Sequence, residues 1–300
     1  MSADSLKAWF EKSDFDSKHN VEGKKVTTLC VGGAIQNLLE PHTIEELVGT
    51  VLFLREQDIS FQVLGGGSNL LIPDSGVECA IRLGKGFRFC EALGASRFKV
   101  GGAMPLMRLS QDLSKAGYAG LEFAGGIPAV IGGATRMNAG AHGGQMSDVL
   151  RAVSYVTPLG ELVECSASEL SFSYRSSSVP KGSVIAQVVI ELQESDSESV
   201  LLKRAEFLAH RKKYQPLSLP SAGSIFKNPS VDLTAGRLIE SLGLKGHTIG
   251  DVSVSKLHAN WIVNPGKCGK ASDVISLIEL IQARAKQSNG VELETELVQW

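Results

Sequence analysis

The pattern of apolar and polar positions along the chain predicts several amphipathic helices. Thr43-Ile44-Glu45-Glu46 forms a capping box, and the apolar residues after it fall on one helical face as far as Leu54. A second helix is predicted from Leu106 to Ala116, where Gly117 ends it. The later helices are predicted at Val200 to Lys213, Ala235 to Leu242 and Ser272 to Lys286.

Short apolar or alternating runs between these helices predict strands. The runs are Ser60 to Leu64, Cys79 to Leu83, Phe98 to Val100, Ala152 to Thr157 and Gly182 to Gln193. The last two suggest antiparallel strands, whereas the first third of the chain has α/β character. Near the end of the chain, Val291 to Val298 alternates strictly and predicts one more strand.

Length and charge limit the class of protein. The chain has 300 residues, of which 43% are apolar, enough to bury one large core or two to three modest ones. Its 30 Lys and Arg residues and 32 Asp and Glu residues give a formal net charge of -2. We therefore expect no nucleic-acid partner, although a local basic pocket for a small anion remains compatible with this balance.

Cysteine spacing and hydropathy bear on the cellular compartment. The five cysteines are widely spaced without a C-x-x-C pair, which argues against a disulfide framework and against a zinc or other metal site. Met1 to Asn20 is polar, so no signal peptide is expected, and apolar runs such as Val184 to Ile190 are too short to cross a bilayer. We expect a cytoplasmic protein without membrane insertion.

Two glycine-rich segments are candidates for a cofactor site. Gly65-Gly66-Gly67-Ser68-Asn69 follows a predicted strand, and its backbone N–H groups can cradle a phosphate, although an ordinary tight turn would have the same residues. The block from Gly125 to Gly144 is dense enough in small residues to form the wall of a ligand site. Within it, His142 is more simply explained as a structural histidine.

Three polar clusters could carry chemistry. Arg175, among uncharged small residues, could clamp a carboxylate or phosphate or lie on the surface. In the loop Pro220 to Pro229, Lys227 and Asn228 could hold an anion beside Ser224, or the loop could be only a polar surface segment. Glu292, Glu294 and Glu296 would share one side of a strand, which is also typical of a solvated edge.

The order and spacing of these motifs resemble the UDP-N-acetylenolpyruvoylglucosamine reductase family from about Val26 to Glu296. The matching motifs are Leu64-Gly-Gly-Gly-Ser-Asn-Leu-Leu71, Gly126-Ile-Pro with Arg136-Met-Asn-Ala-Gly140, Tyr174-Arg175, Gly223-Ser-Ile-Phe-Lys-Asn-Pro229, His258-Ala-Asn260 with Ile262-Val-Asn264, and Leu293-Glu-Thr-Glu296. The short chain is similar to the compact class, which lacks an extra tyrosine loop.

The resemblance implies an α+β fold in three parts. A two-subdomain FAD-binding fold of the vanillyl-alcohol-oxidase type would precede a C-terminal α+β domain that closes over the substrate. The implied boundaries are 1–83 for the first subdomain, with 296–300 as a candidate addition, 84–213 for the second and 214–295 for the substrate domain.

The resemblance also implies the reaction and its residues. FAD, bound non-covalently, and NADPH as co-substrate would reduce UDP-N-acetylglucosamine enolpyruvate to UDP-N-acetylmuramate for peptidoglycan synthesis. The implied catalytic residues are Arg175, Ser224 and Glu296, with Glu294 as the alternative to Glu296. The implied cofactor-binding residues are Gly65, Gly66, Gly67, Ser68, Asn69, Gly125, Ile127, Pro128, Gly132 and Gly133. The implied substrate-binding residues are Tyr174, Lys227, Asn228, His258 and Asn260.

Two other functions would use part of the same sequence. An FAD-dependent alcohol oxidase would share the first two motifs but would not need the loop around Ser224, and such oxidases often attach flavin through His or Cys. A non-catalytic module that binds flavin or a nucleotide sugar would not need Arg175, Ser224 and Glu296 together. The oligomeric state is not set by the sequence, and a monomer is compatible with it.

Overall fold

The computed structural model describes residues 16–300, so most of the segment on which the signal-peptide prediction rests lies outside the described residues. The chain divides into two compact units. Of the described residues, unit 1 contains 16–19, 37–66 and 78–210, and unit 2 contains 20–36, 67–77 and 211–300. The three-domain boundaries given above stay a prediction.

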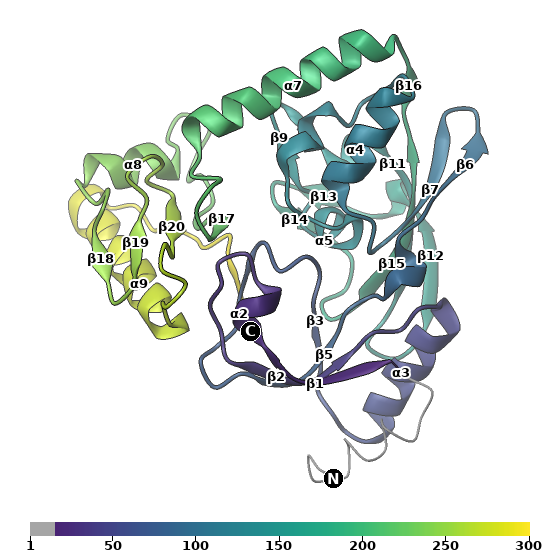
Figure 1. Ribbon diagram of the computed structural model, residues 1–300, viewed down its shortest axis with the longest axis horizontal. Helices are drawn as coiled ribbons and strands as arrows, with labels where there is room; N and C mark the ends of the chain where they lie inside the picture. Colours follow the sequence, from purple (N-terminus) through teal and green to yellow (C-terminus); the bar gives the residue numbers. More distant parts are fainter. Residues whose placement is uncertain (1–15) are drawn as a thin grey trace. The chain divides into compact units, whose positions relative to one another are not determined.

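The larger sheet of unit 1 has five antiparallel strands. Their order is β12 (Leu162–Ser166), β11 (Leu150–Val156), β15 (Val184–Glu191), β7 (Arg97–Gly101) and β6 (Cys90–Gly94). Helix α4 (Leu106–Lys115) buries Leu106, Leu109 and Leu113 in one core with β7 and β15, and Figure 1 shows this part of the chain in teal. The predicted antiparallel strands and the predicted helix are confirmed.

A second sheet has the order β1 (Ser17–Glu22), β2 (Ala34–Leu39), β5 (Val77–Ile81) and β3 (Gln62–Val63), and its first three strands each run across the division between the units. Helix α3 (Ile44–Glu56) buries Leu47, Val51 and Leu54 in a core of unit 1. Thr43 caps this helix by accepting from the backbone N–H of Glu46 at 3.2 Å. The Glu46 carboxylate accepts from the N–H of His42 instead of Thr43, so the capping box is displaced by one residue.

The remaining elements outside the C-terminal region are short, except for α7. They are α2 (Gly23–Val26), β4 (Leu70–Leu71), η1 (Lys85–Phe87), β8 (Tyr118–Ala119), η2 (Glu122–Gly126), α5 (Ile131–Arg136), β9 (Gly140–Ala141), β10 (Gly144–Gln145), α6 (Met146–Val149), η3 (Ala167–Glu169), β13 (Phe172–Ser173), β14 (Ser176–Ser177), β16 (Gln193–Glu194) and α7 (Ser197–Tyr214). The glycine-rich block therefore folds into short turns of helix and two-residue strands.

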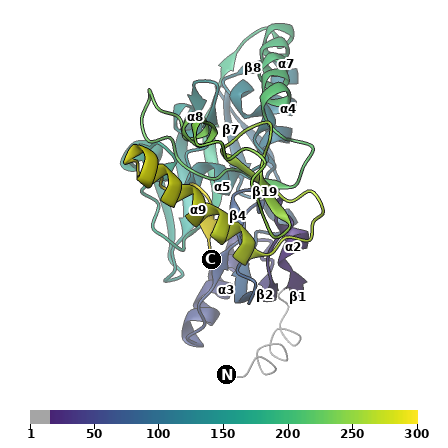
Figure 2. The same ribbon diagram turned by 90° about the vertical axis from the view of Figure 1, so that its left-hand side faces the viewer.

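The C-terminal part of unit 2 is a small α+β layer. Its sheet has the order β17 (Ser221–Ser224), β20 (Trp261–Val263), β19 (Val252–Val254) and β18 (Thr248–Ile249). Helices α8 (Ala235–Ser241) and α9 (Ala271–Asn289) supply Leu238, Leu277 and Ile281 to a core that includes Val252 and Val254. Figure 2 shows α9 beside β19, and both helices confirm the sequence predictions.

The predicted strand from Val291 to Val298 is wrong. Only β21 (Val298–Gln299) is a strand, and it pairs in parallel with β4, while Thr295 makes an isolated bridge to Phe226. Leu293 and Leu297 are both buried, so the apolar positions of the alternating pattern do face the core. The segment opposite them is a loop rather than a strand, and it offers single hydrogen bonds instead of a ladder.

Several properties of the described chain bear on function. The five cysteines are free thiols, and burial raises the pKa of Cys79 to about 12, so this thiol is inert at neutral pH. No helix among residues 16–300 combines the length and the apolar character that crossing a bilayer requires. The same residues contain no group of His, Cys, Asp or Glu side chains arranged to hold a metal ion.

Candidate active site

The first glycine loop and the glycine-rich block meet within unit 1. A Cβ placed on Gly65 would lie 3.5 Å from Val130 Cγ2 and 3.9 Å from Gly133 Cα. A Cβ on Gly66 would lie 3.5 Å from the carbonyl oxygen of Pro128. Two motifs that are distant in the sequence therefore form one backbone surface, as a shared ligand wall requires.

This surface has the properties that bind a dinucleotide such as FAD. Among residues 16–300, no atom lies within 4 Å of a Cβ placed on Gly133, and no acceptor takes the N–H groups of Gly65, Gly66 or Gly133. Nearby in α5, the buried hydroxyl of Thr135 also has no partner in the described chain. Open space beside unpaired N–H donors suits an anionic diphosphate and a flat ring system, so the residues present fit the cofactor.

Gly125 and Gly132 have a packing reason for lacking a side chain. A Cβ on Gly125 would lie 2.8 Å from Arg204 Cγ, and one on Gly132 would lie 3.0 Å from the carbonyl oxygen of Ile185. Ile127 packs, partly buried, against the core of unit 1. These three residues pack against neighbouring parts of unit 1, and their contact with a cofactor stays a prediction.

The second half of the first loop belongs to unit 2. Gly67 has φ +65°, and a Cβ there would lie 1.9 Å from the carbonyl oxygen of Val26, so glycine is required. Ser68 is half-buried, and its hydroxyl has no hydrogen bond to the described chain. Asn69 donates from Nδ2 to the carbonyl oxygen of Glu296 at 2.9 Å and accepts from the N–H of Val298 at 3.2 Å. Asn69 therefore holds the segment that carries Glu296.

Tyr174 and Arg175 form the two-residue tip of the β13–β14 hairpin in unit 1. Arg175 has φ +58°, a left-handed conformation that costs a non-glycine residue about 1 kcal/mol. Its guanidinium lies 5.1 Å from the centroid of the Tyr174 ring, and Tyr174 is 50% exposed. Arg175 itself is half-buried, and its role toward a ligand anion stays a prediction.

The base of this hairpin is held by residues for which the sequence motifs predict no such role. Asn138 donates to the carbonyl oxygen of Ser173 at 3.2 Å, and the Ser177 hydroxyl donates to the carbonyl oxygen of Arg136 at 2.9 Å. The Arg136 guanidinium donates to the carbonyl oxygens of Val179, Pro180 and Ser183. The small residues of this motif predict a ligand wall, and only the three-dimensional structure shows that the motif anchors the arginine turn.

Ser224 lies in unit 2 at the end of β17. The pairs Ser221 with Val263 and Ser224 with Trp261 leave one extra residue on β17, which is a β-bulge. Gly223, inside the bulge, has φ +78°, and a Cβ placed on it would meet no atom within 4 Å. Ser224 is half-buried, and no residue of the described chain hydrogen-bonds its hydroxyl. The bulge therefore presents a hydroxyl that is available to a ligand.

Glu296 is tied directly to the Ser224 loop. Its backbone N–H donates to the carbonyl oxygen of Ile225 at 2.7 Å, and the residue is half-buried. By contrast, the Glu294 side chain is 72% exposed and pairs with Lys227 Nζ at 2.5 Å, and Glu292 pairs with Lys286 at 2.7 Å. Glu294 is also bonded to this loop, since its carbonyl oxygen accepts from the N–H of Lys227 at 2.9 Å. Burial therefore distinguishes Glu296 from the other two glutamates, and its catalytic role stays a prediction.

The other predicted substrate residues of unit 2 have defined protein partners. Asn228 is exposed, and its Oδ1 accepts from the N–H of Ala235 at the start of α8. His258 Nδ1 accepts from the N–H of Asn260 at 3.2 Å. Burial, followed by the charge of Lys245, lowers the pKa of His258, which keeps this nitrogen an acceptor. The amide of Asn260 lies inside the unit and contacts backbone rather than open space.

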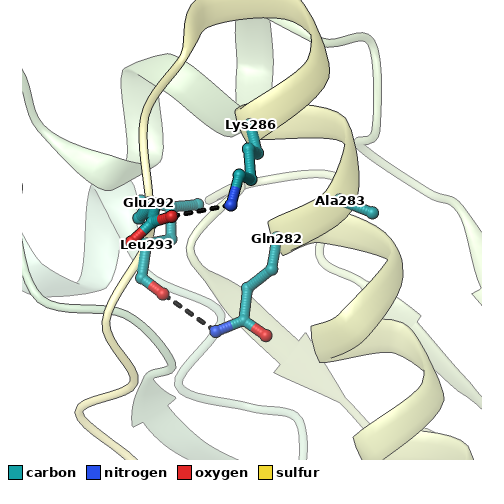
Figure 3. A pocket seen from close by; sticks show the side chains of 5 residues that line it. All are labelled: Gln282, Ala283, Lys286, Glu292 and Leu293. Carbon is teal, nitrogen blue, oxygen red and sulfur yellow. Dashed lines mark hydrogen bonds and ion pairs between the residues drawn. The ribbon is translucent and has the colours of Figure 1, made fainter.

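Two features lie apart from these residues. A shallow hollow of about 300 Å³ is lined by Gln282, Ala283, Lys286, Glu292 and Leu293, where Gln282 donates to the carbonyl oxygen of Leu293 and Lys286 pairs with Glu292 (Figure 3). None of the predicted site residues lines it.

In unit 1, His142 has φ +53° and stacks on Phe207 with ring centroids 4.3 Å apart, so this ring packs against α7.

Comparisons with known proteins show which family the chain is similar to. Residues 215–300 match the family model described as UDP-N-acetylenolpyruvoylglucosamine reductase, C-terminal domain, and residues 35–166 match a model described as FAD binding domain. The chain is 41% identical over 273 residues to the UDP-N-acetylenolpyruvoylglucosamine reductase of Heliobacterium modesticaldum, covering 90% of this chain and 86% of the relative. It is 37% identical to the protein of the same name from Bacillus subtilis, covering 90% and 89%.

A solved structure is also similar over almost the whole chain. The crystal structure of UDP-N-acetylenolpyruvylglucosamine reductase from Thermus caldophilus matches with a TM-score of 0.81 and 37% sequence identity. The match covers 95% of this chain and 98% of that one.

Proposed function

Because the chain belongs to the UDP-N-acetylenolpyruvoylglucosamine reductase family, we propose that it reduces UDP-N-acetylglucosamine enolpyruvate to UDP-N-acetylmuramate, with NADPH as reductant and FAD as cofactor. Its fold is the α+β fold expected above, with an FAD-binding domain followed by the C-terminal domain of the reductase family. The observation that carries the catalytic assignment is the Ser224 bulge, whose next residue accepts the backbone N–H of Glu296.

The residues that would hold FAD are those of the open backbone surface in unit 1. Gly65, Gly66 and Gly133 offer N–H donors that have no acceptor in the described chain, and Pro128 borders them. When bound, FAD would supply the hydride chemistry that couples oxidation of NADPH to reduction of the enolpyruvyl group. Gly67, Ser68 and Asn69 would continue the binding loop, with Asn69 also holding the segment of Glu296.

Arg175 would stabilise the negative charge that develops on the carboxylate and the adjacent carbon of the substrate. A preorganised donor aimed at developing charge can contribute on the order of 3 kcal/mol. The left-handed turn and its anchors at Asn138 and Arg136 fix the arginine before substrate arrives. Tyr174, stacked with the guanidinium, would support it and contact the substrate.

Ser224 would donate the proton that completes the reduction. A serine hydroxyl is a weak acid, but a carbanion is a far stronger base, so the transfer runs downhill when the geometry is correct. Glu296 would orient the substrate carboxylate or act as a protonated acid beside it. Lys227 and Asn228 would contact the anionic part of the substrate, and binding would then take Lys227 from its ion pair with Glu294.

The reaction places the protein among the enzymes that make peptidoglycan precursors, and we propose that it acts in the cytoplasm. The alcohol-oxidase alternative is not favoured, because the chain carries the reductase C-terminal domain with the serine loop. A binding module without catalysis is not favoured by the same observation. The oligomeric state is not part of this proposal, and a monomer is compatible with the sequence.

Anaerobic half-reactions test this assignment. In the Ser224→Ala variant, NADPH should still bleach the yellow protein at the normal rate, because Ser224 acts only on the second substrate. Recovery of colour on adding the enolpyruvyl UDP-sugar should slow by about 10³-fold, the scale expected for loss of a general acid. Stopped-flow absorbance measures both steps.

Ser221→Ala is the matched control, because Ser221 lies on the same strand and uses its backbone, not its hydroxyl, to contact Thr28. Both half-reactions of this variant should stay within about 3-fold of normal, far below the loss that removal of a catalytic group causes. Equal slowing of both half-reactions in Ser224→Ala would contradict the catalytic assignment and make Ser224 structural.

A further inference from the structure

Asn260 makes a pair of hydrogen bonds to one residue of the Ser224 loop. Its Oδ1 accepts from the N–H of Phe226 at 3.0 Å, and its Nδ2 donates to the carbonyl oxygen of Phe226 at 2.8 Å. Its own carbonyl oxygen accepts from the N–H of Ile225 at 2.9 Å. Three hydrogen bonds from one asparagine therefore restrain the two residues that follow Ser224.

The amide of Asn260 continues the pairing between β17 and β20 beyond the point where the backbone pairing of these strands ends. The last backbone pair between β17 and β20 is Ser224 with Trp261. Beyond it, the Asn260 amide pairs with Phe226 as a neighbouring strand would, with one donor and one acceptor. On the other side of Ser224, the bulge at Gly223 has positive φ and open space. The restraint on Ser224 thus comes from the two residues that follow it, which are bonded to Asn260 and, through the carbonyl oxygen of Ile225, to Glu296.

The environment of Asn260 is that of a positioning group. The residue is 4% exposed, and both atoms of its amide are engaged on Phe226, which is 1% exposed. Its N–H donates to His258 Nδ1, so the imidazole fixes the backbone from which the amide extends. The amide keeps one further N–H and one further lone pair, but a side chain that is 4% exposed gives a sugar nucleotide little access to them.

We propose that Asn260 is a positioning residue that sets the orientation of the Ser224 hydroxyl for proton transfer, and not a substrate ligand. This inference rests on the proposed function, because it assigns Asn260 a role through Ser224. Proton transfer to carbon is sensitive to geometry, and displacement of a reacting group by about 1 Å can slow a reaction by about 10²-fold. Loosening the loop should therefore slow the step that uses substrate while leaving substrate affinity intact.

The first test is Asn260→Ala in anaerobic half-reactions. Bleaching by NADPH should be unchanged, and the dissociation constant for the enolpyruvyl UDP-sugar should stay within about 3-fold. The rate of colour recovery at saturating sugar nucleotide should fall by about 10- to 100-fold. A raised dissociation constant with a normal saturating rate would overturn the proposal and make Asn260 a substrate contact.

Asn264→Ala is the matched control for burial. Asn264 is 0% exposed, and its side chain also bridges backbone, with bonds to Leu29, Cys30 and Gly269 outside the Ser224 loop. Its one bond to that loop, from its N–H to the carbonyl oxygen of Pro220, is made by backbone and is retained in the variant. It should lower the thermal midpoint much as Asn260→Ala does but keep the saturating rate. If Asn264→Ala slows colour recovery as much as Asn260→Ala, the effect is general loosening and the proposal fails.

Asn260→Asp adds a chemical rescue. A protonated aspartic acid has a hydroxyl that can donate to the Phe226 carbonyl and an oxygen that can accept its N–H, whereas the carboxylate only accepts. The saturating rate of this variant, relative to the unmodified protein at each pH, should therefore recover as the pH falls. A ratio that stays constant with pH would contradict the positioning role.

The double variant Ser224→Ala with Asn260→Ala separates this inference from the proposed function. If Asn260 acts through Ser224, the double variant should be little slower than Ser224→Ala alone. A full multiplicative loss would sink the inference and leave the catalytic role of Ser224 intact. A normal rate of colour recovery in Ser224→Ala would instead remove the proposed function itself.

Discussion

The turn that carries Arg175 and the loop that carries Ser224 present their side chains in opposite ways. At the first, the functional residue itself takes the left-handed conformation, with φ +58°. At the second, the neighbouring Gly223 takes it, with φ +78°. Arg175 therefore stores strain in its own backbone, while Ser224 is aimed by a glycine and is restrained from the other side.

The difference follows from what each side chain must do. A long guanidinium can reach a carboxylate from a range of directions, so its turn is fixed at the base by Asn138 and Arg136. A serine hydroxyl has only one rotatable bond before its oxygen, so the backbone must supply the direction. That requirement explains why the Ser224 loop is bonded residue by residue, to Asn260 on one side and to Glu296 on the other.

Replacing Arg175 should have the largest effect in this comparison. We expect Arg175→Ala and Arg175→Gly both to slow colour recovery by about 10²- to 10³-fold, because each removes a donor to the developing charge. Arg175→Gly should be more stable than Arg175→Ala by about 1 kcal/mol, since glycine adopts positive φ without a Cβ penalty. Stopped-flow absorbance and denaturant unfolding measure the two effects.

Both variants lose the contact with Tyr174, so their difference in stability isolates the backbone. Equal stability of Arg175→Ala and Arg175→Gly would show that the turn relaxes at no cost, and the strain would then have no part in presenting the arginine.

The glutamates come next in expected size. We expect Glu296→Gln to slow colour recovery by about 10²-fold, because its carboxyl would act in the same step as Ser224. Glu294→Gln should change the saturating rate by less than about 3-fold, since this exposed side chain contributes only a surface ion pair with Lys227. The reverse order of effects would transfer the catalytic role to Glu294.

Much of the fold could be predicted from sequence, because the signals were local, whereas the site residues stay a prediction. Capping residues, apolar periodicity and glycine placement define α3, α4, α8 and α9 within a few residues. The strand predicted from Val291 to Val298 failed because alternation shows which residues are buried, but not whether a partner strand lies beside them.

The roles of the asparagines could not be predicted for a related reason. Asn69, Asn138 and Asn260 lie in motifs with glycine, serine or histidine, and such motifs favour a place on a ligand surface. In the structure each donates its amide to a backbone carbonyl far away in sequence, on Glu296, Ser173 and Phe226. A motif shows that a residue is near the chemistry, while its partner depends on how distant segments meet.

A smaller effect is expected at Gly223. Gly223→Ala meets no atom within 4 Å, so its cost is conformational, about 1–2 kcal/mol for a side chain at positive φ. The bulge should shift to relieve this strain and turn Ser224, and we expect colour recovery about 10-fold slower with normal bleaching. Gly243→Ala is the control, because Gly243 has φ +71°, equally open space and a place at the end of α8. It should lose similar stability with a normal rate, and slowing by both variants would contradict a local effect.

The smallest effect on activity is expected at Asp74, whose carboxylate accepts from the N–H groups of Ala271 and Ser272 at the start of α9. Burial by itself raises the pKa of Asp74, but these N–H groups outweigh it and hold the pKa below its ordinary value. Because the pKa is lower in the folded protein, the ionised carboxylate stabilises the fold. This contribution to the free energy of unfolding is complete above the pKa of an ordinary aspartate. It is lost as the pH falls through the lowered pKa of Asp74 in the folded protein. Asp74→Ala should cost about 1 kcal/mol at pH 7 and less in acid, measured as the denaturant midpoint across pH. Asp74→Asn keeps one acceptor oxygen and should lose less stability, without the pH dependence.

Because Asp74 does not touch the Ser224 loop, its variants should keep the normal rate of colour recovery. A slowed rate in Asp74→Ala would mean that general stability of unit 2, rather than local hydrogen bonds, sets the position of the serine.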